Sequence, residues 1–293
     1  MKTRRELQKE FCETYLGITA SPWHLPQSIR RRIQAVTHLI IDTGQLSDDS
    51  LVFDHAWSLD GELAEVKDSA RRALVGTASP RMMHLRSALG DVDPQPHEPV
   101  SHDEGRLTSS VWHHGEVYQS YWLGDPERIL QIADLTEAER EAILMKVRKA
   151  SRDGQLVYAT GRAMAAELPH TPHSYRRTQK LVSIGLLYFT PQLYPDTTQA
   201  VRKLQTYGIT VIYASCDARH MVEAIAPLAG ISSRQAIPIV STHGGHLPLD
   251  QVYYAELSNA EIQRIFHYYP EGSVILARHP LPEFVELMDA VRK

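Results

Sequence analysis

The sequence predicts an α/β fold in which a parallel sheet is interrupted by an inserted α+β module. In the C-terminal part, short apolar runs typical of buried strands alternate with helical stretches, which is the pattern of βαβ units. A separate apolar run at residues 37–41 would add one strand to the same sheet. Between these parts, residues 55–175 combine helical periodicity with an alternating hairpin, which indicates a second, inserted module.

Helices in the N-terminal half are indicated by apolar spacings of three and four and by capping signals. Asp125 precedes Pro126, an N-cap residue followed by proline at the first helical position. Thr136 and Glu139 have the spacing of a capping box. The expected helices cover residues 1–35 (broken at Pro22 and Pro26), 59–90, 126–130 and 135–154.

Strands in this half are indicated by alternation and by buried apolar runs. Residues 107–123 alternate on both sides of a turn at His114-Gly115, which predicts a hairpin. Residues 155–163 read as a further strand, whereas residues 91–106 are rich in proline and aspartate and predict a loop.

The C-terminal half repeats strand and helix. Strands are expected at residues 181–189, 209–215, 236–241 and 273–278, and helices at 195–208, 218–230, 258–269 and 281–293. We therefore expect one α/β domain from residues 1–54 and 176–293, with residues 1–31 as a helical extension, and an inserted α+β domain from residues 55–175.

Bulk properties exclude several classes of function. The chain has 293 residues, 43% of them hydrophobic, with a net charge of -4, which gives no electrostatic case for nucleic acid or an anionic membrane. Neither a signal peptide nor an apolar run of the ~20 residues needed to span a bilayer is visible. Two distant cysteines indicate a reducing compartment, so a cytoplasmic location is expected. The pairs His113-His114 and His170/His173 lack further ligands, so we expect no metal site.

Polar residues follow three of the predicted parallel strands. Asp42 follows the first, Ser215 and Asp217 follow or end the second, and Arg278-His279 end the last. Carboxyl ends of parallel strands carry function, and a nucleophilic aspartate with a hydroxyl and a cation suits transfer through an aspartyl-phosphate. An aspartate after an apolar strand is, however, more often a turn or N-cap residue, so that alternative stays open for Asp42.

The order of these segments resembles the cytoplasmic phosphorylation and nucleotide domains of P-type ATPases, members of the haloacid dehalogenase (HAD) superfamily. The resemblance runs from about Arg32 to the end of the chain and is carried by residues 185–231, 98–130, 151–163 and 272–291. It implies a Rossmann-like, HAD-like sheet with a nucleotide-domain-like insertion, and it implies phosphoryl-transfer chemistry at the strand ends.

The phosphorylation motif departs from the family pattern Asp-Lys-Thr-Gly-Thr-Leu-Thr, because this chain has "DTGQLS" at residues 42–47. Aligned without a gap, Ile41 replaces the nucleophile and Asp42 the lysine. With one deletion, Asp42 is the nucleophile and the lysine is missing, which the position of the strand favours. Asp42, Ser215 and Asp217 are therefore degenerate candidates for the catalytic set.

The nucleotide site implied by the resemblance is altered as well. The stacking aromatic corresponds to Val100, the lysine to Leu123 and an arginine to Gln155. Asp125 stands where the family has alanine. The loss of the lysine and the added Asp125 carboxylate should repel a triphosphate. The degenerate cofactor-binding positions are Arg106, Gly124, Asp125 and Glu127.

Further family residues are missing. The aspartate of Asp-Pro becomes Thr190, the phosphate-binding lysine falls on Glu283 or Phe284, and the chain stops before the magnesium-binding Gly-Asp-Gly motif. Phosphoryl transfer depends on positioning and electrostatics, so these losses remove most of its basis. We therefore expect no cofactor. Mg²⁺ and ATP would be bound only if the protein had kept some phosphoryl-transfer activity.

Three functions follow from this comparison. The first is a soluble P-type-ATPase-like pseudoenzyme that binds or regulates an unidentified protein partner. The alternative is a divergent HAD-type hydrolase or phosphatase, or an ATP-binding protein, that uses Asp42. The third is a cytosolic subunit of a membrane transporter, without membrane insertion of its own. Residues 1–31 would dock on a partner or cover a sheet edge.

Overall fold

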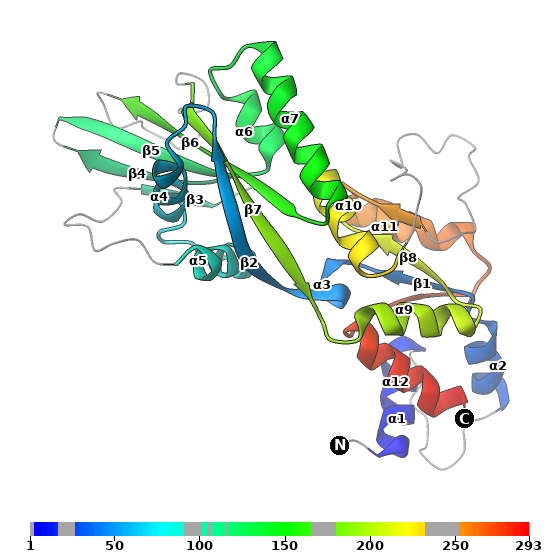
Figure 1. Cartoon of the computed structure of the whole chain (residues 1–293). Helices are drawn as coiled ribbons and strands as arrows, with labels where there is room; N and C mark the ends of the chain where they lie inside the picture. The colour runs from blue at the N-terminus through cyan, green and yellow to red at the C-terminus, as the bar shows by residue number, and fades with distance from the viewer. Residues whose placement is uncertain are drawn as a thin grey trace. The chain divides into compact units, whose positions relative to one another are not determined.

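The computed structural model divides the chain into two compact units, residues 1–48 with 192–293 and residues 49–191 (Figure 1). Together they form a mixed α/β structure with one parallel and one antiparallel sheet. The structure describes residues 3–16, 27–90, 101–104, 107–114, 116–165, 180–231 and 252–292. The predicted strand at residues 236–241 lies outside these residues.

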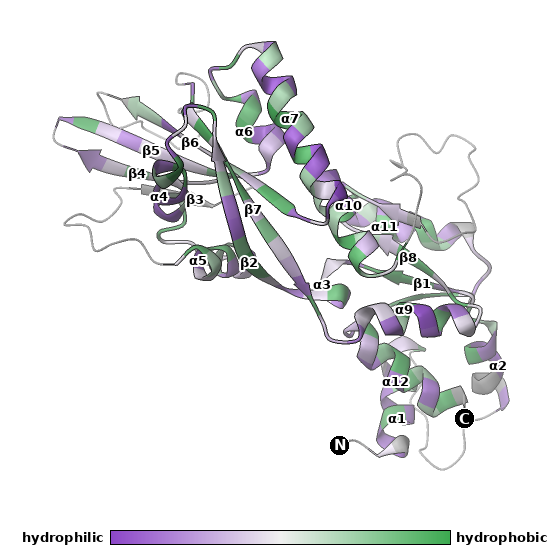
Figure 2. Ribbon diagram, in the orientation of Figure 1, coloured by the Kyte–Doolittle hydropathy of each residue, from purple (hydrophilic) through white to green (hydrophobic). Residues whose placement is uncertain are grey.

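A four-stranded parallel sheet forms the centre of the first unit, with the order β10-β1-β8-β9. These strands are β1 (His38–Ile41), β8 (Thr210–Ala214), β9 (Val252–Tyr254) and β10 (Val274–Leu276). All four residues of β1 are buried, as expected for a parallel strand covered on both faces, and β1 and β8 are hydrophobic along most of their length (Figure 2). β9 was not predicted, because its three residues are too few to show a strand pattern.

Helices surround this sheet. They are α1 (Arg4–Tyr15), α2 (Gln27–Ala35), α3 (Thr43–Leu46), α9 (Thr197–Thr206), α10 (Arg219–Leu228), α11 (Asn259–Ile265) with the 3-10 turn η1 (Phe266–Tyr268), and α12 (Leu281–Arg292). The N-terminal helix α1 packs along α12, and its residues Phe11 and Cys12 are fully buried. The rings of Tyr15 and Phe284 meet edge-on, with their centroids 4.8 Å apart. Residues 4–15 thus contribute to the core of this unit.

The second unit contains a six-stranded sheet with the order β2-β7-β6-β5-β4-β3. Its strands are β2 (Ser47–Ser58), β3 (Ser101–Glu104), β4 (Leu107–His114), β5 (Val117–Gly124), β6 (Leu156–Ala165) and β7 (Val182–Leu193). The prediction that residues 181–189 belong to the parallel sheet is wrong, since β7 pairs antiparallel with β6. Its apolar run at residues 184–189 is buried throughout, and such a run is typical of a parallel strand.

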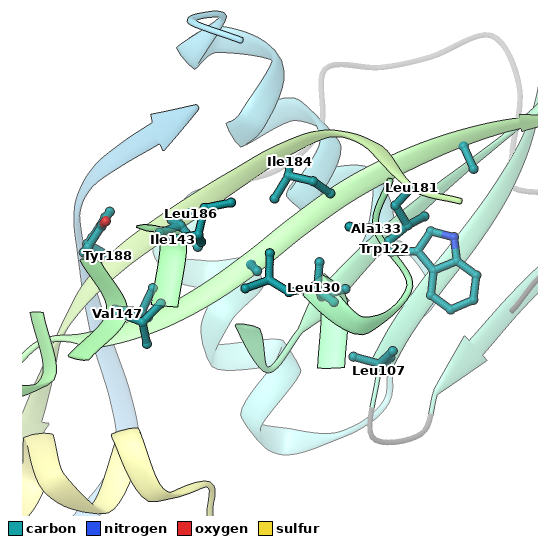
Figure 3. Close-up of a cluster of buried hydrophobic side chains, with 14 of the residues drawn as sticks. Leu107, Trp122, Leu130, Ala133, Ile143, Val147, Leu181, Ile184, Leu186 and Tyr188 are labelled. Atoms are coloured by element: carbon teal, nitrogen blue, oxygen red, sulfur yellow. The ribbon is translucent and has the colours of Figure 1, made fainter. Parts of the chain in front are cut away.

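Helices pack against this sheet and bury hydrophobic side chains between helix and strand. They are α4 (Leu63–Ala73), α5 (Pro80–Leu89), α6 (Pro126–Gln131) and α7 (Glu137–Arg152). Figure 3 shows the core between the strands and α6–α7, where Trp122, Leu130 and Ile143 converge with side chains of β7. The expected hairpin, the Asp125 cap of α6 and the Thr136–Glu139 capping box of α7 are confirmed.

Two local predictions for this unit are wrong, and one strand was not predicted. The single helix at residues 59–90 is two helices, because the chain turns at Gly76 with a φ of 86° before α5 begins at Pro80. Residues 101–104, expected in a loop, form the edge strand β3. β2 was missed because its twelve residues include three aspartates and few buried positions. Because β2 and β7 belong to this sheet, the boundaries between the units fall at residues 48/49 and 191/192, whereas residues 54/55 and 175/176 were expected.

Candidate functional site

The candidate site lies at the carboxyl edge of the parallel sheet. β1 leads into Asp42, and its neighbour β8 leads into Ser215 and Asp217. β10, on the other side of β1, leads toward Arg278 and His279. The sheet order therefore brings the three predicted catalytic residues to one edge.

Asp42 is the N-cap of the short helix α3. Its Oδ1 accepts a hydrogen bond from the Thr43 N–H at 2.8 Å, and its own N–H donates to Gln45 Oε1 at 2.8 Å. The Asp42 side chain also accepts from the N–H of Gln45, and this reciprocal pair of bonds between Asp42 and Gln45 is a capping box. The alternative interpretation of Asp42, as a cap at a strand end, matches the local structure.

Thr43 lies at the centre of the site. Its Oγ1 is 2.6 Å from Asp217 Oδ2, 2.8 Å from the Tyr213 hydroxyl and 3.2 Å from Ser215 Oγ. A threonine hydroxyl can donate one hydrogen bond and accept two, whereas a carboxylate only accepts. Thr43 therefore donates to the Asp217 carboxylate, and Tyr213 and Ser215 donate to Thr43.

Backbone contacts hold Ser215 in this network. Ser215 Oγ accepts from the Asp217 N–H at 3.2 Å, and the Ser215 N–H donates to the Tyr254 carbonyl at 3.0 Å. Ser215 is 1% exposed and Tyr213 is fully buried. Because the Asp217 N–H donates to Ser215 Oγ and the Tyr254 carbonyl holds the Ser215 backbone, the Ser215 hydroxyl proton is left to point toward Thr43 Oγ1.

Sequence reasoning missed Thr43 and Tyr213 as site residues. Tyr213 is on β8, two residues before Ser215, which directly follows the strand, and this spacing lets both hydroxyls reach Thr43 from the same side. A tyrosine in an otherwise aliphatic buried strand needs a partner for its hydroxyl, and that requirement was the available signal.

The rim of the site is acidic. Cys216 is exposed, yet desolvation raises the pKa of its thiol, and the carboxylates of Asp42, Asp217 and Glu261 raise it further. A thiol with a raised pKa stays protonated at neutral pH and is a poor nucleophile. On the other side of β1, His279 Nδ1 lies 3.6 Å from Glu283, and the Phe284 ring is fully buried.

The predicted nucleotide-site positions lie in the second unit. Gly124 ends β5, and Asp125 Oδ1 accepts from the N–H groups of Glu127 and Arg128 at 2.9 and 3.3 Å. Leu123, which the resemblance aligns with a lysine, is fully buried. These residues therefore serve the β5–α6 junction, while Arg106 lies outside the described residues.

Among the residues that the structure describes, no group of three or more His, Cys, Asp or Glu side chains is placed to hold a metal ion. His113 and His114 are exposed at the end of β4, and the His113 ring stacks on Tyr118 at 4.8 Å. His170 and His173 lie outside the described part of the chain.

Within that part, none of the helices has the length and apolar character required to cross a bilayer. No protein-family model matches the chain, and no curated protein matches it significantly.

Proposed function

We propose that the chain is a P-type-ATPase-like protein without phosphoryl-transfer chemistry that acts by binding a protein partner. One observation carries the proposal: the Thr43 hydroxyl takes hydrogen bonds from the hydroxyls of Tyr213 and Ser215 and gives its own proton to Asp217. The polar groups at the strand ends thus bond to one another.

A phosphoryl group at these strand ends would need donors and positive charge. The Ser215 hydroxyl, which would be the donor, is directed at Thr43. The nearby ionisable groups that act on Cys216 are three carboxylates, which repel a phosphate dianion. A ligand would have to break the network and overcome this repulsion.

The neighbouring order of β10, β1 and β8 supports the HAD-like part of the proposal, because the resemblance requires these strand ends to be adjacent. Burial of Leu123 supports the loss of nucleotide binding, since a fully buried leucine offers a triphosphate neither charge nor access. A cytosolic subunit of a membrane transporter is one form that the partner-binding function can take.

The test is a turnover assay with p-nitrophenyl phosphate and with ATP, each with Mg²⁺, on the wild type and on Asp42→Asn. We expect both proteins to give the rate of the buffer. A ligand that binds only the folded state raises the melting temperature. Because we expect no binding, a thermal-shift series with ATP, ADP and BeF₃⁻ should leave the melting temperature unchanged.

The alternative is a divergent hydrolase or an ATP-binding protein that uses Asp42. The observation in its favour is that Asp42, Ser215 and Asp217 do follow adjacent strands. Turnover that Asp42→Asn abolishes while Thr43→Ser retains it would establish the hydrolase and refute the pseudoenzyme. Stabilisation by ATP without turnover would establish nucleotide binding.

A further inference from the structure

The second unit exposes large apolar side chains where β2 leads into α4. Leu59 is 39% exposed and Leu63 is 53% exposed. Val182, at the start of β7, is 48% exposed, and Met164, near the end of β6, is 60% exposed. We refer to these four residues as the apolar surface. Exposed apolar side chains that gather at one place indicate a site of interaction.

Backbone pairing brings the segments that carry Leu59, Val182 and Met164 together. The Leu59 N–H donates to the carbonyl of Ile184 at 3.0 Å, two residues from Val182. Val182 is the cross-strand partner of Arg162, and Met164 lies two residues from Arg162 on the same face of β6. Leu63 begins α4.

An ion pair fixes α4 against this part of the sheet. Arg162 Nη2 lies 2.8 Å from Glu65 Oε2, and Arg162 Nε donates to Ser183 Oγ at 3.2 Å. Glu65 lies in the first turn of α4, two residues after Leu63. The ion pair therefore holds the start of α4 beside β6 and β7, the elements that carry Leu63, Met164 and Val182.

Carboxylates border the apolar surface. Asp60 and Glu62 are exposed between Leu59 and Leu63, and Glu65 follows them. The Glu65 carboxyl, which hydrogen-bonds to Glu62 and repels it, raises the pKa of Glu62. A hydrogen bond from Ser58 lowers the pKa of Asp60, so this carboxylate stays charged. Glu62 and Glu65 therefore both lie near the Arg162 guanidinium, and Asp60 adds a third carboxylate to this border.

We propose that this surface docks a basic amphipathic segment of a partner protein. The apolar face of the segment lies on Leu59, Leu63, Met164 and Val182, and its lysine or arginine side chains pair with Glu62 and with Asp60. The inference rests on the partner-binding part of the proposed function and names the chemistry of the partner. Grooves and faces that bind amphipathic helices have this combination of apolar anchors and complementary charge.

Charge argues against other occupants. Two copies of the chain joined symmetrically through this surface would place like carboxylates against each other, because a twofold interface pairs the same patch. An anionic lipid surface would meet the same repulsion. A cationic partner instead relieves the repulsion between Glu62 and Glu65.

The experiment is calorimetric titration of the full chain with a synthetic helical peptide that has leucine on one face and lysine on the other. One control peptide has the same composition in scrambled order, and another has glutamate in place of lysine. We expect saturable binding of the first peptide alone, weakened about tenfold by Leu63→Ser and by Glu62→Lys, in line with anchor residues of interfaces.

Two matched variants on α7 control for general effects, Met145→Ser and Glu137→Lys. Met145 is 60% exposed, and the Glu137 side chain is 81% exposed. Both should bind the peptide as the wild type does. Absence of saturable binding, equal binding of the scrambled peptide, or equal weakening by the control variants overturns the proposal. Self-association that Leu63→Ser abolishes, seen by light scattering, also overturns it in favour of a second copy.

These outcomes are independent of the strand-end site. The phosphatase assay does not involve the apolar surface, so failed peptide binding leaves the absence of phosphoryl chemistry standing. Turnover dependent on Asp42 would refute the pseudoenzyme without changing the peptide result.

Discussion

Thr43→Val tests whether the hydroxyl network stabilises the first unit. Valine has nearly the shape of threonine, so the substitution removes Oγ1 and its three hydrogen bonds without opening a large cavity. The hydroxyls of Tyr213 and Ser215 lose their shared acceptor in a buried place, and Asp217 loses a donor.

The expected loss follows from the burial of these groups. A buried polar group left without its partner costs about 1–3 kcal/mol, and a bond to a charged group is worth about 1.5–3 kcal/mol. Tyr213 and Ser215 are buried, whereas Asp217 is half-buried and can take a water molecule instead. We therefore expect the free energy of unfolding to fall by about 3–4 kcal/mol, below the sum of the separate costs.

Denaturant unfolding followed by far-UV circular dichroism measures this change, with Thr43→Ser as the matched control. Serine keeps the hydroxyl and loses one methyl group, so it should cost about 1 kcal/mol. Combining Thr43→Val with Tyr213→Phe should cost less than the sum of the single changes, because the two hydroxyls share one bond. If Thr43→Val and Thr43→Ser are equally stable, the network contributes nothing and the reasoning is refuted.

Three further predictions concern other parts of the chain. Gly185→Ala should destabilise the second unit by about 1–3 kcal/mol, because a Cβ there would lie 2.5 Å from the methyl groups of Val66 on α4. Thr136→Ala should remove the α7 capping box at a cost of about 1 kcal/mol. The side-chain hydrogen bond from Thr136 lowers the pKa of Glu139. The stabilisation by the ionised Glu139 is therefore present above the ordinary glutamate pKa and is lost as the pH falls through the lowered pKa. NMR titration should show that the pKa of Glu139 is higher in Thr136→Ala than in the wild type. A maleimide should label Cys216 in the folded protein, with a rate that increases toward alkaline pH because the pKa of its thiol is raised.

Each of these predictions has a control within the chain. Gly44→Ala should be tolerated, since nothing lies within 4 Å of its added Cβ; equal losses at Gly44 and Gly185 would contradict the packing argument. An unchanged pKa of Glu139 in Thr136→Ala would exclude the capping bond as its cause. Cys12 is buried and should react only after unfolding, so labelling of both thiols in the folded protein would contradict the burial of α1.

Local signals predicted the elements that depend on neighbouring residues. The β4–β5 hairpin, the proline start of α6 and the capping box of α7 are set by interactions within a few residues, and all three are present. The partnership of β7 could not be predicted this way. An apolar run records burial on both faces, and burial is the same in a parallel sheet and in an antiparallel sheet covered by helices.

β2 illustrates the opposite failure. Its sequence is polar and acidic, so alternation did not reveal it, yet it forms the twelve-residue edge of the second sheet. An edge strand is buried less than a central one and carries little hydrophobic pattern. Its backbone hydrogen bonds to β7 decide its structure, and those depend on residues more than a hundred positions away.

The sequence by itself determined that Asp42, Ser215 and Asp217 follow buried strands, because apolar runs and the residues that end them are local features. Only the tertiary structure decided what these residues do with their hydrogen-bonding groups. Thr43 and Tyr213 come from segments 170 positions apart, and their hydroxyls meet because β1 and β8 pair in register, Ile41 with Tyr213. A hydroxyl has one proton to give, and the packing of the sheet directs it to a neighbouring side chain.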